Sequence, residues 1–103
     1  MLNMSNRKII ITKEAENDII SIENYIAIDN KNAAKDFVIK LKKTFINLSK
    51  YPRLGKNHPK LLGDDKILFL PVMRNYLIVY TVIDDNIHIV RVLTTYRNIC
   101  AIL

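Results

Sequence analysis

The sequence predicts an α+β domain in which a hairpin of two helices packs on a small, mostly antiparallel sheet. Two helical apolar stripes follow one another between Thr12 and Pro52, and three strand-length runs rich in β-branched and aromatic residues follow them. One short β-branched run precedes the first stripe. The predicted order is therefore β-α-α-β-β-β, and a chain of this length is expected to form a single domain over residues 1–103.

The first predicted strand is Arg7–Thr12, and a helix follows it directly. Thr12 can cap the N-terminus of this helix, and Glu14 and Glu16 lie in its first turn, where the helix dipole favours acids. The apolar face consists of Ala15, Ile19, Ile22 and Ile26. The turn-favouring run Asp29–Asn32 ends the pattern.

The second predicted helix begins directly after this run. Its apolar stripe consists of Ala34, Phe37, Leu41, Phe45 and Leu48. Lysines occupy the opposite side, and Pro52 and Gly55 end the helix. Because the connection between the two helices is so short, they are predicted to form an antiparallel hairpin.

Helical periodicity disappears after a polar, basic connection over residues 53–66. The three predicted strands are Ile67–Val72, Tyr76–Ile83 and Ile87–Leu93. Pro71 indicates an edge position or a bulge in the first of them, because proline cannot donate a ladder hydrogen bond. Asp84–Asn86 predicts a tight hairpin loop between the last two strands.

Positive charge is concentrated in one part of the chain. The whole chain carries +6, whereas the window Lys35–Lys60 contains eight cations and one acid and so carries +7. Such a region favours an anionic partner, either nucleic acid or an acidic protein segment, although a solvated lysine-rich helix face explains the same charges. The residues expected to bind a target or a partner are Lys42, Lys43, Lys50, Arg53, Lys56 and Lys60.

Several classes of protein are excluded by what the sequence lacks. No apolar run approaches the 18 or so residues that cross a bilayer, and the N-terminus does not resemble a signal peptide, so we expect a cytoplasmic protein with no membrane partner. The single Cys100 suits a reducing compartment. Cys100, His58 and His88 do not fall at zinc-ligand spacings, and no glycine-rich phosphate loop occurs, so we predict no metal and no cofactor.

Arg91 interrupts an otherwise apolar strand. An unpaired buried charge would cost several kcal/mol, so this arginine must pair, extend to solvent, or open onto a cleft. Strand alternation places Ile87, Ile89 and Leu93 on its face. We expect Arg91 to be structural in its main role, holding a carboxylate or a carbonyl.

Three further residues could gather at one end of the sheet. Arg74 precedes the central strand, and Tyr96 and Arg97 follow the last one, so antiparallel pairing would bring them together. Guanidinium groups beside a tyrosine ring suit RNA phosphate and base, whereas an intramolecular salt-bridge anchor is the alternative. The candidate catalytic residues are accordingly Arg74, Arg91, Tyr96 and Arg97.

Three segments in this order resemble the RelE/ParE superfamily of type II toxins: ITKEAENDIISIENYI, AAKDFVIKLKKTFINLSKYPRLG and NYLIVYTVIDDNIHIVRVLTTYRN. The most specific parts are Tyr51–Gly55, Tyr76–Tyr80, and Ile89–Leu93 followed by Arg97. The resemblance covers roughly residues 8–103. It implies the same β-α-α-β-β-β order in a small bacterial toxin that is neutralised by a cognate antitoxin encoded beside it. The basic window predicts that this antitoxin carries an acidic segment.

Two branches of the superfamily differ in target. RelE-type members cleave mRNA in the ribosomal A site. ParE-type members resemble them in fold but poison DNA gyrase and have no nuclease site. Leu77 stands where the nucleases commonly carry an arginine, and the terminal residues 100–103 lack their tyrosine or His-Tyr pair. These departures are more similar to the ParE branch.

We therefore predict a growth-inhibiting, plasmid-stabilising toxin that acts on DNA gyrase. The alternative is a ribosome-dependent mRNA endonuclease, which would be metal-independent. A non-toxic nucleic-acid-binding module is a weaker alternative hypothesis. Phe37 and Phe45 of the basic window fall on the core stripe and so cannot stack with bases.

Overall fold

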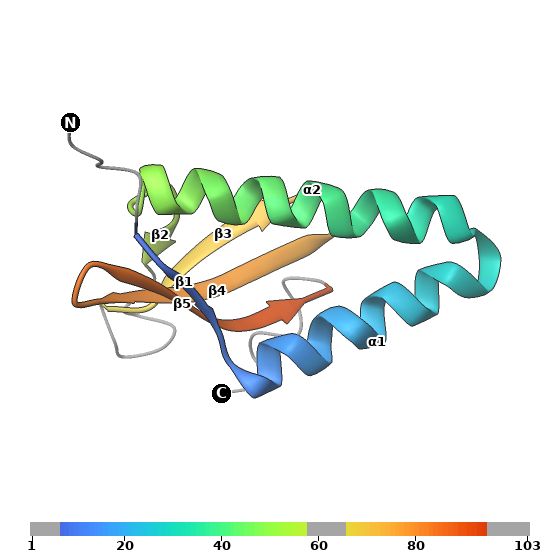
Figure 1. The fold of residues 1–103 in the computed structure, drawn as a ribbon, viewed down its shortest axis with the longest axis horizontal. Helices are drawn as coiled ribbons and strands as arrows, with labels where there is room; N and C mark the ends of the chain where they lie inside the picture. The colour runs from blue at the N-terminus through green and yellow to red at the C-terminus, as the bar shows by residue number, and fades with distance from the viewer. Residues whose placement is uncertain (1–6, 58–65, 95–103) are drawn as a thin grey trace.

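In the computed structural model, two helices lie on one face of a five-stranded sheet (Figure 1). The structure describes residues 7–57 and 66–94. The elements are β1 (Ile9–Ile11), α1 (Lys13–Asp29), α2 (Lys31–Lys50), β2 (Lys56–Asn57), β3 (Leu68–Val72), β4 (Tyr76–Ile83) and β5 (Asn86–Leu93). Among these residues, neither helix is apolar enough over a sufficient length to cross a membrane. The predicted α+β class and the helical hairpin on the sheet are confirmed.

The strands lie in the order β1-β5-β4-β3-β2. The first and last strands of the predicted order, β1 and β5, are parallel neighbours, and every other pair is antiparallel. The strand β2 was not predicted: Lys56 and Asn57 pair with Phe69 and Leu68, within the stretch expected to be only a polar connection. Two exposed polar residues carry no alternation, so the sequence gives no signal for this strand.

One residue joins the two helices. The backbone N–H of Asn30 donates to the Ile26 carbonyl and closes α1, while its side-chain oxygen accepts from the N–H of Ala33 and caps α2. The break expected over residues 29–32 is thus confined to Asn30, because one side chain serves both helix ends. This connection makes the helices antiparallel neighbours that contact each other and spread apart with distance from Asn30 (Figure 1).

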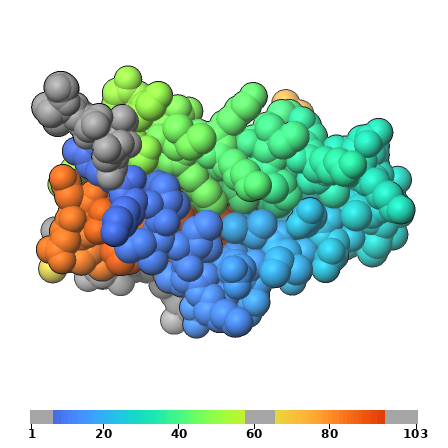
Figure 2. Space-filling model, in the orientation of Figure 1, coloured from blue at the N-terminus to red at the C-terminus, as the bar shows by residue number. Residues whose placement is uncertain are grey.

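The main core lies between the helices and the sheet. The predicted stripe of α2 is buried there with Ala15 and Ile22 of α1. It meets Ile78, Tyr80 and Ile89 of the sheet. Figure 2 shows α1 and α2 covering this face of the molecule. A second buried cluster consists of Phe69, Leu77, Val79 and Leu93, so the sheet is apolar on both faces.

A bulge in β5 corrects the predicted neighbours of Arg91. Val79 pairs with Arg91 but Tyr80 pairs with Ile89, which leaves Val90 as an extra residue. Beyond this point the alternation is reversed, and Val92 joins Ile89 in the helix-facing core while Leu93 belongs to the second cluster. Because Arg91 pairs with Val79 of the second cluster, it shares a face with Leu93, as expected. The expectation that Ile87 and Ile89 lie on this face too is wrong, since both belong to the helix-facing core.

The predictions from Pro71 and from Asp84–Asn86 can both be compared with the sheet. In the described part of the chain, β2 pairs only with Leu68 and Phe69, so Pro71 lies where β3 is an edge strand, as expected. Asp84 and Asp85 form the loop between β4 and β5 with φ of 51° and 69°, the positive values that a two-residue hairpin of this type requires.

Candidate functional site

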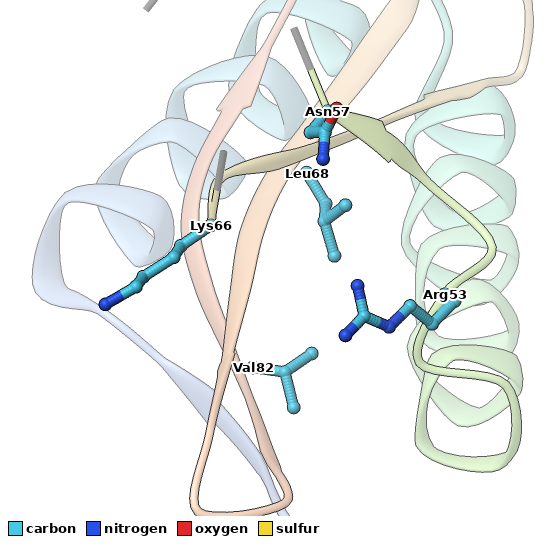
Figure 3. A pocket seen from close by; sticks show the side chains of 5 residues that line it. All are labelled: Arg53, Asn57, Lys66, Leu68 and Val82. Carbon is cyan, nitrogen blue, oxygen red and sulfur yellow. The ribbon is translucent and has the colours of Figure 1, made fainter. Parts of the chain in front are cut away.

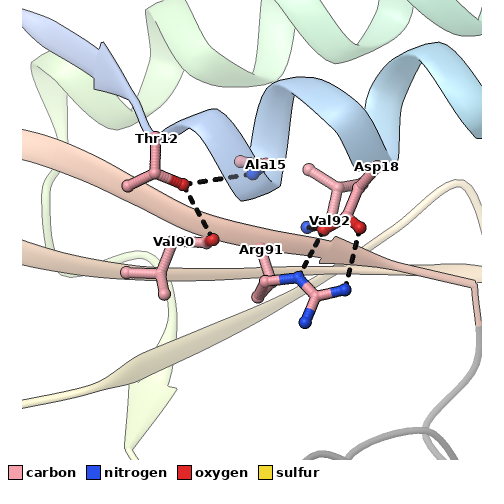
Figure 4. Close-up of polar contacts among 6 residues, drawn as sticks. All are labelled: Thr12, Ala15, Asp18, Val90, Arg91 and Val92. Carbon is pink, nitrogen blue, oxygen red and sulfur yellow. Dashed lines mark hydrogen bonds and ion pairs between the residues drawn. The ribbon is translucent and has the colours of Figure 1, made fainter.

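Arg91 is held by α1. Its Nε donates to Asp18 Oδ2 at 2.7 Å and its Nη2 donates to Asp18 Oδ1 at 2.8 Å, so the pair is bidentate (Figure 4). The hydrogen bond to Asp18 raises the pKa of Arg91, and partial burial acts against it. The expectation that Arg91 holds a carboxylate is confirmed, and its contribution to activity stays a prediction.

The same junction satisfies the exposed backbone of β5 after β1 has ended. Thr12 donates its backbone N–H to the Ile89 carbonyl at 3.1 Å and its hydroxyl to the Val90 carbonyl at 3.0 Å. Asp18 accepts from the N–H of Val92 at 3.0 Å (Figure 4). Thr12 also accepts from the N–H of Ala15 and caps α1, as predicted. The first turns of α1 therefore continue the edge of the sheet.

Of the four candidate catalytic residues, the structure describes two, Arg74 and Arg91, and these two have different surroundings. Arg74 is exposed in the β3–β4 turn with φ of 70°, next to the end of the sheet where Leu77 pairs with Leu93. Arg91 pairs instead with Val79 and its guanidinium binds Asp18. Tyr96 and Arg97 lie outside the described residues. Of the predicted set, only Arg91 thus has an assigned partner in the described chain.

Leu77 belongs to the second apolar cluster. Only 1% of its surface is exposed, and it is buried with Phe69, Val79 and Leu93. A charged side chain at this position would lose its hydration unless a partner were buried with it. Leu77, at the position where RelE-type nucleases commonly carry an arginine, is thus part of the apolar packing of the second cluster.

The predicted basic residues form an exposed series along one stretch of chain. Lys42, Lys43 and Lys50 lie on α2, Arg53 lies in the loop that follows, and Lys56 lies on β2. Lys60 is outside the described residues. All five described cations are exposed, so this part of the surface attracts anions at long range.

Tyr80 fixes the loop within this basic series. Its hydroxyl donates to the Pro52 carbonyl and accepts from the N–H of Gly55, both at 2.8 Å. Burial raises the pKa of Tyr80, while the Gly55 hydrogen bond and the charge of Arg53 act in the opposite direction. One feature of the sequence indicates such a contact, because the hydroxyl of a tyrosine in an apolar strand needs a hydrogen-bond partner.

The far end of the helical hairpin exposes apolar side chains. Tyr25 and Ile28 are 78% and 79% exposed, at the end of α1 that extends past the sheet (Figure 1). Exposed apolar groups of this size are typical of protein-binding surfaces when they gather in one place. Among residues 7–57 and 66–94, no group of His, Cys, Asp and Glu side chains is arranged to hold a metal ion.

Comparison with known proteins links this fold to one family. The family model described as "ParE toxin of type II toxin-antitoxin system, parDE" matches residues 9–99. Among solved structures, a chain of the "Chromosomal ParDE TA system from P. aeruginosa" has a similar fold, with a TM-score of 0.71 and 17% sequence identity. The similarity covers 88% of this chain and 98% of that chain. None of the curated proteins matches the sequence.

Proposed function

Because this chain belongs to the ParE toxin family of type II toxin-antitoxin systems, we propose that it inhibits growth by acting on DNA gyrase in the cytoplasm and is neutralised by a cognate antitoxin. The solved structure with a similar fold comes from a ParDE toxin-antitoxin system, which supports an antitoxin partner. Plasmid stabilisation would follow from such a pairing of toxin and antitoxin.

The burial of Leu77 is the observation that favours gyrase rather than mRNA as the target. A phosphoryl-transfer site needs positioned cations near the reacting phosphate, and the loss of one typically costs about 10²–10³ in rate. Leu77 fills its position with hydrocarbon, and the guanidinium of Arg91 is already bound to the carboxylate of Asp18 in α1. These two observations favour a toxin that acts by binding a protein.

The exposed end of the hairpin is the surface we assign to the target. Tyr25 and Ile28 are exposed near the C-terminal end of α1. This end of α1 extends past the sheet, far from the C-terminal end of α2 that the loop with Arg53 follows (Figure 1). Aromatic and aliphatic side chains of this kind provide much of the binding free energy in protein interfaces. Target and antitoxin would then contact different parts of the toxin.

The proposal is tested with purified protein in two assays, gyrase supercoiling and cell-free translation. We expect the wild-type chain to inhibit supercoiling, and Ile28→Ser to raise the half-inhibitory concentration about tenfold, because it removes exposed apolar area at the target surface. Ile39→Ser is the matched control, since Ile39 is also an exposed isoleucine on a helix, at 52% exposure. In cells, replication should stop before translation does.

Two results would contradict action on gyrase. Codon-register cuts in the mRNA, found by primer extension within minutes and absent when Arg97 or Tyr96 is replaced, would show a ribosome-dependent nuclease instead. Unchanged supercoiling at every toxin concentration would also contradict the proposal.

A further inference from the structure

A pocket of about 370 Å³ lies beyond the C-terminal end of α2. The described residues that line it are Arg53, Asn57, Lys66, Leu68 and Val82 (Figure 3). Leu68 and Val82 belong to the helix-facing side of the sheet and form the apolar part of the pocket. The guanidinium of Arg53 points over the space between them (Figure 3). The pocket thus combines a hydrocarbon surface with a cation.

Arg53 is positioned by its neighbours in the chain. The carbonyl of the residue before it, Pro52, accepts from Tyr80, and Gly55 donates to the same hydroxyl. The N–H of Leu54 donates to the Tyr51 carbonyl at 3.2 Å and tightens the loop. Tyr80 is completely buried in β4, so the loop that carries Arg53 is attached to the core of the sheet.

The guanidinium of Arg53 is available for a ligand. Within the described chain it makes no hydrogen bond or ion pair, in contrast to Arg91 with Asp18. Asn57 and Lys66 already take part in interactions of their own. A planar guanidinium suits a carboxylate, which can accept two parallel hydrogen bonds from it.

We propose that this pocket binds a glutamate-like carboxylate of the antitoxin's acidic segment, with its methylene groups on Leu68 and Val82 and its carboxylate on Arg53. This inference rests on the proposed antitoxin partner and names one contact within it. Nucleic acid fits the pocket less well, because none of the lining residues within 7–57 and 66–94 is aromatic and could stack with a base.

The chemistry of the pocket is tested first without the antitoxin. N-acetylglutamate amide is titrated into the full chain while NMR follows the Arg53 Nε–H and the methyl groups of Leu68 and Val82. All three groups should shift together. N-acetylglutamine amide has the same length without the charge and should bind about tenfold more weakly. Equal shifts with inorganic phosphate, or with a short oligonucleotide, would overturn the assignment to a carboxylate side chain.

The contact is then tested in the complex with the protein encoded beside the toxin. Arg53→Gln should increase the dissociation rate about tenfold or more and change the association rate little, because a desolvated pair mainly affects dissociation. Lys35→Gln, which removes the same charge from an exposed position on α2, should leave the dissociation rate unchanged. Arg53→Lys keeps the charge without the planar group and should fall between wild type and Arg53→Gln.

The two proposals fail in different ways. If the antitoxin binds Arg53→Gln with the wild-type dissociation rate, the pocket assignment is wrong and the toxin-antitoxin proposal stands. If no neighbouring protein binds the wild-type chain, the antitoxin proposal fails and the pocket assignment fails with it, even where the glutamate analogue still binds.

Discussion

Arg91 and Asp18 form the contact that joins the helical layer to the last strand. The sequence was enough to predict that Arg91 needs a partner, because a cation stood in an apolar strand. It was not enough to identify Asp18, which lies 73 residues earlier and reaches Arg91 only once α1 is docked on the sheet. Long-range pairs of this kind depend on the tertiary structure, and a single sequence carries no local signal for them.

We expect Arg91→Ala to lower thermal stability. Among the described residues, the substitution leaves the partly buried Asp18 carboxylate with the Val92 N–H alone as a partner, which should cost about 1–3 kcal/mol. The melting temperature should fall by about 10 °C, measured by circular dichroism. Lys40→Ala breaks the exposed Asp36–Lys40 pair and should change stability by well under about 1 kcal/mol. Full stability together with complete loss of toxicity would instead place Arg91 in the functional site.

Tyr80 should make stability depend on pH in the alkaline range. Its pKa is raised by burial, so the folded state holds the phenolic proton more tightly than the unfolded state does. The resulting stabilisation is fully present below about pH 10, the ordinary tyrosine pKa, and is lost as the pH rises through the folded pKa. Urea titrations of the wild type and Tyr80→Phe measure it. At pH 8 the variant should be less stable by about 1–3 kcal/mol, because Gly55 and Pro52 lose their partner.

The difference between wild type and Tyr80→Phe should narrow above pH 10, since only the wild type has this phenol to ionise. A difference that stays constant up to pH 11 would show that the hydroxyl is not coupled to folding. The other tyrosines are common to both proteins and cancel in the comparison.

At the scale of secondary structure, elements with a regular apolar period were predictable and irregular ones were not. The stripe through Phe37, Leu41 and Phe45 fixed α2, and Tyr76–Ile83 was predicted with the bounds that β4 has. The bulge at Val90 and the strand β2 follow from how the strands pair, which no periodicity reveals. The same holds for the pocket, because Arg53 and Val82 meet only through the folded loop.

The loop between α2 and β2 should not tolerate a side chain at Gly55. A Cβ there would lie 2.8 Å from the backbone oxygen of Phe69 and 2.9 Å from the Tyr80 hydroxyl. Because the strand backbone cannot move away cheaply, Gly55→Ala should cost about 1–3 kcal/mol in chemical denaturation. Ser21→Ala, at an exposed position in α1, is the control and should be neutral or slightly stabilising. A Gly55→Ala protein as stable as the control would mean that this close approach is relaxed in solution.

For the whole molecule, the asymmetry of charge has a kinetic consequence. The exposed cations from Lys42 to Lys56 lie in one stretch, so an acidic antitoxin segment should be attracted before contact. Stopped-flow association rates should fall about tenfold or more between about 50 mM and 500 mM salt. Lys42→Gln with Lys43→Gln should reduce this dependence. A rate that is constant over the range would rule out electrostatic attraction by this surface.

The pairing of β1 with β5 also determines the order in which the protein can assemble during synthesis. The helical hairpin needs only contacts between adjacent segments and can form early, whereas β1 must wait for the strand that the ribosome makes last among those described. Until then β1 lacks the strand with which it pairs, and Asp18 of α1 lacks Arg91. A nascent chain therefore exposes its helical surface before its sheet is complete. An antitoxin that binds the sheet would then recognise only the fully synthesised toxin.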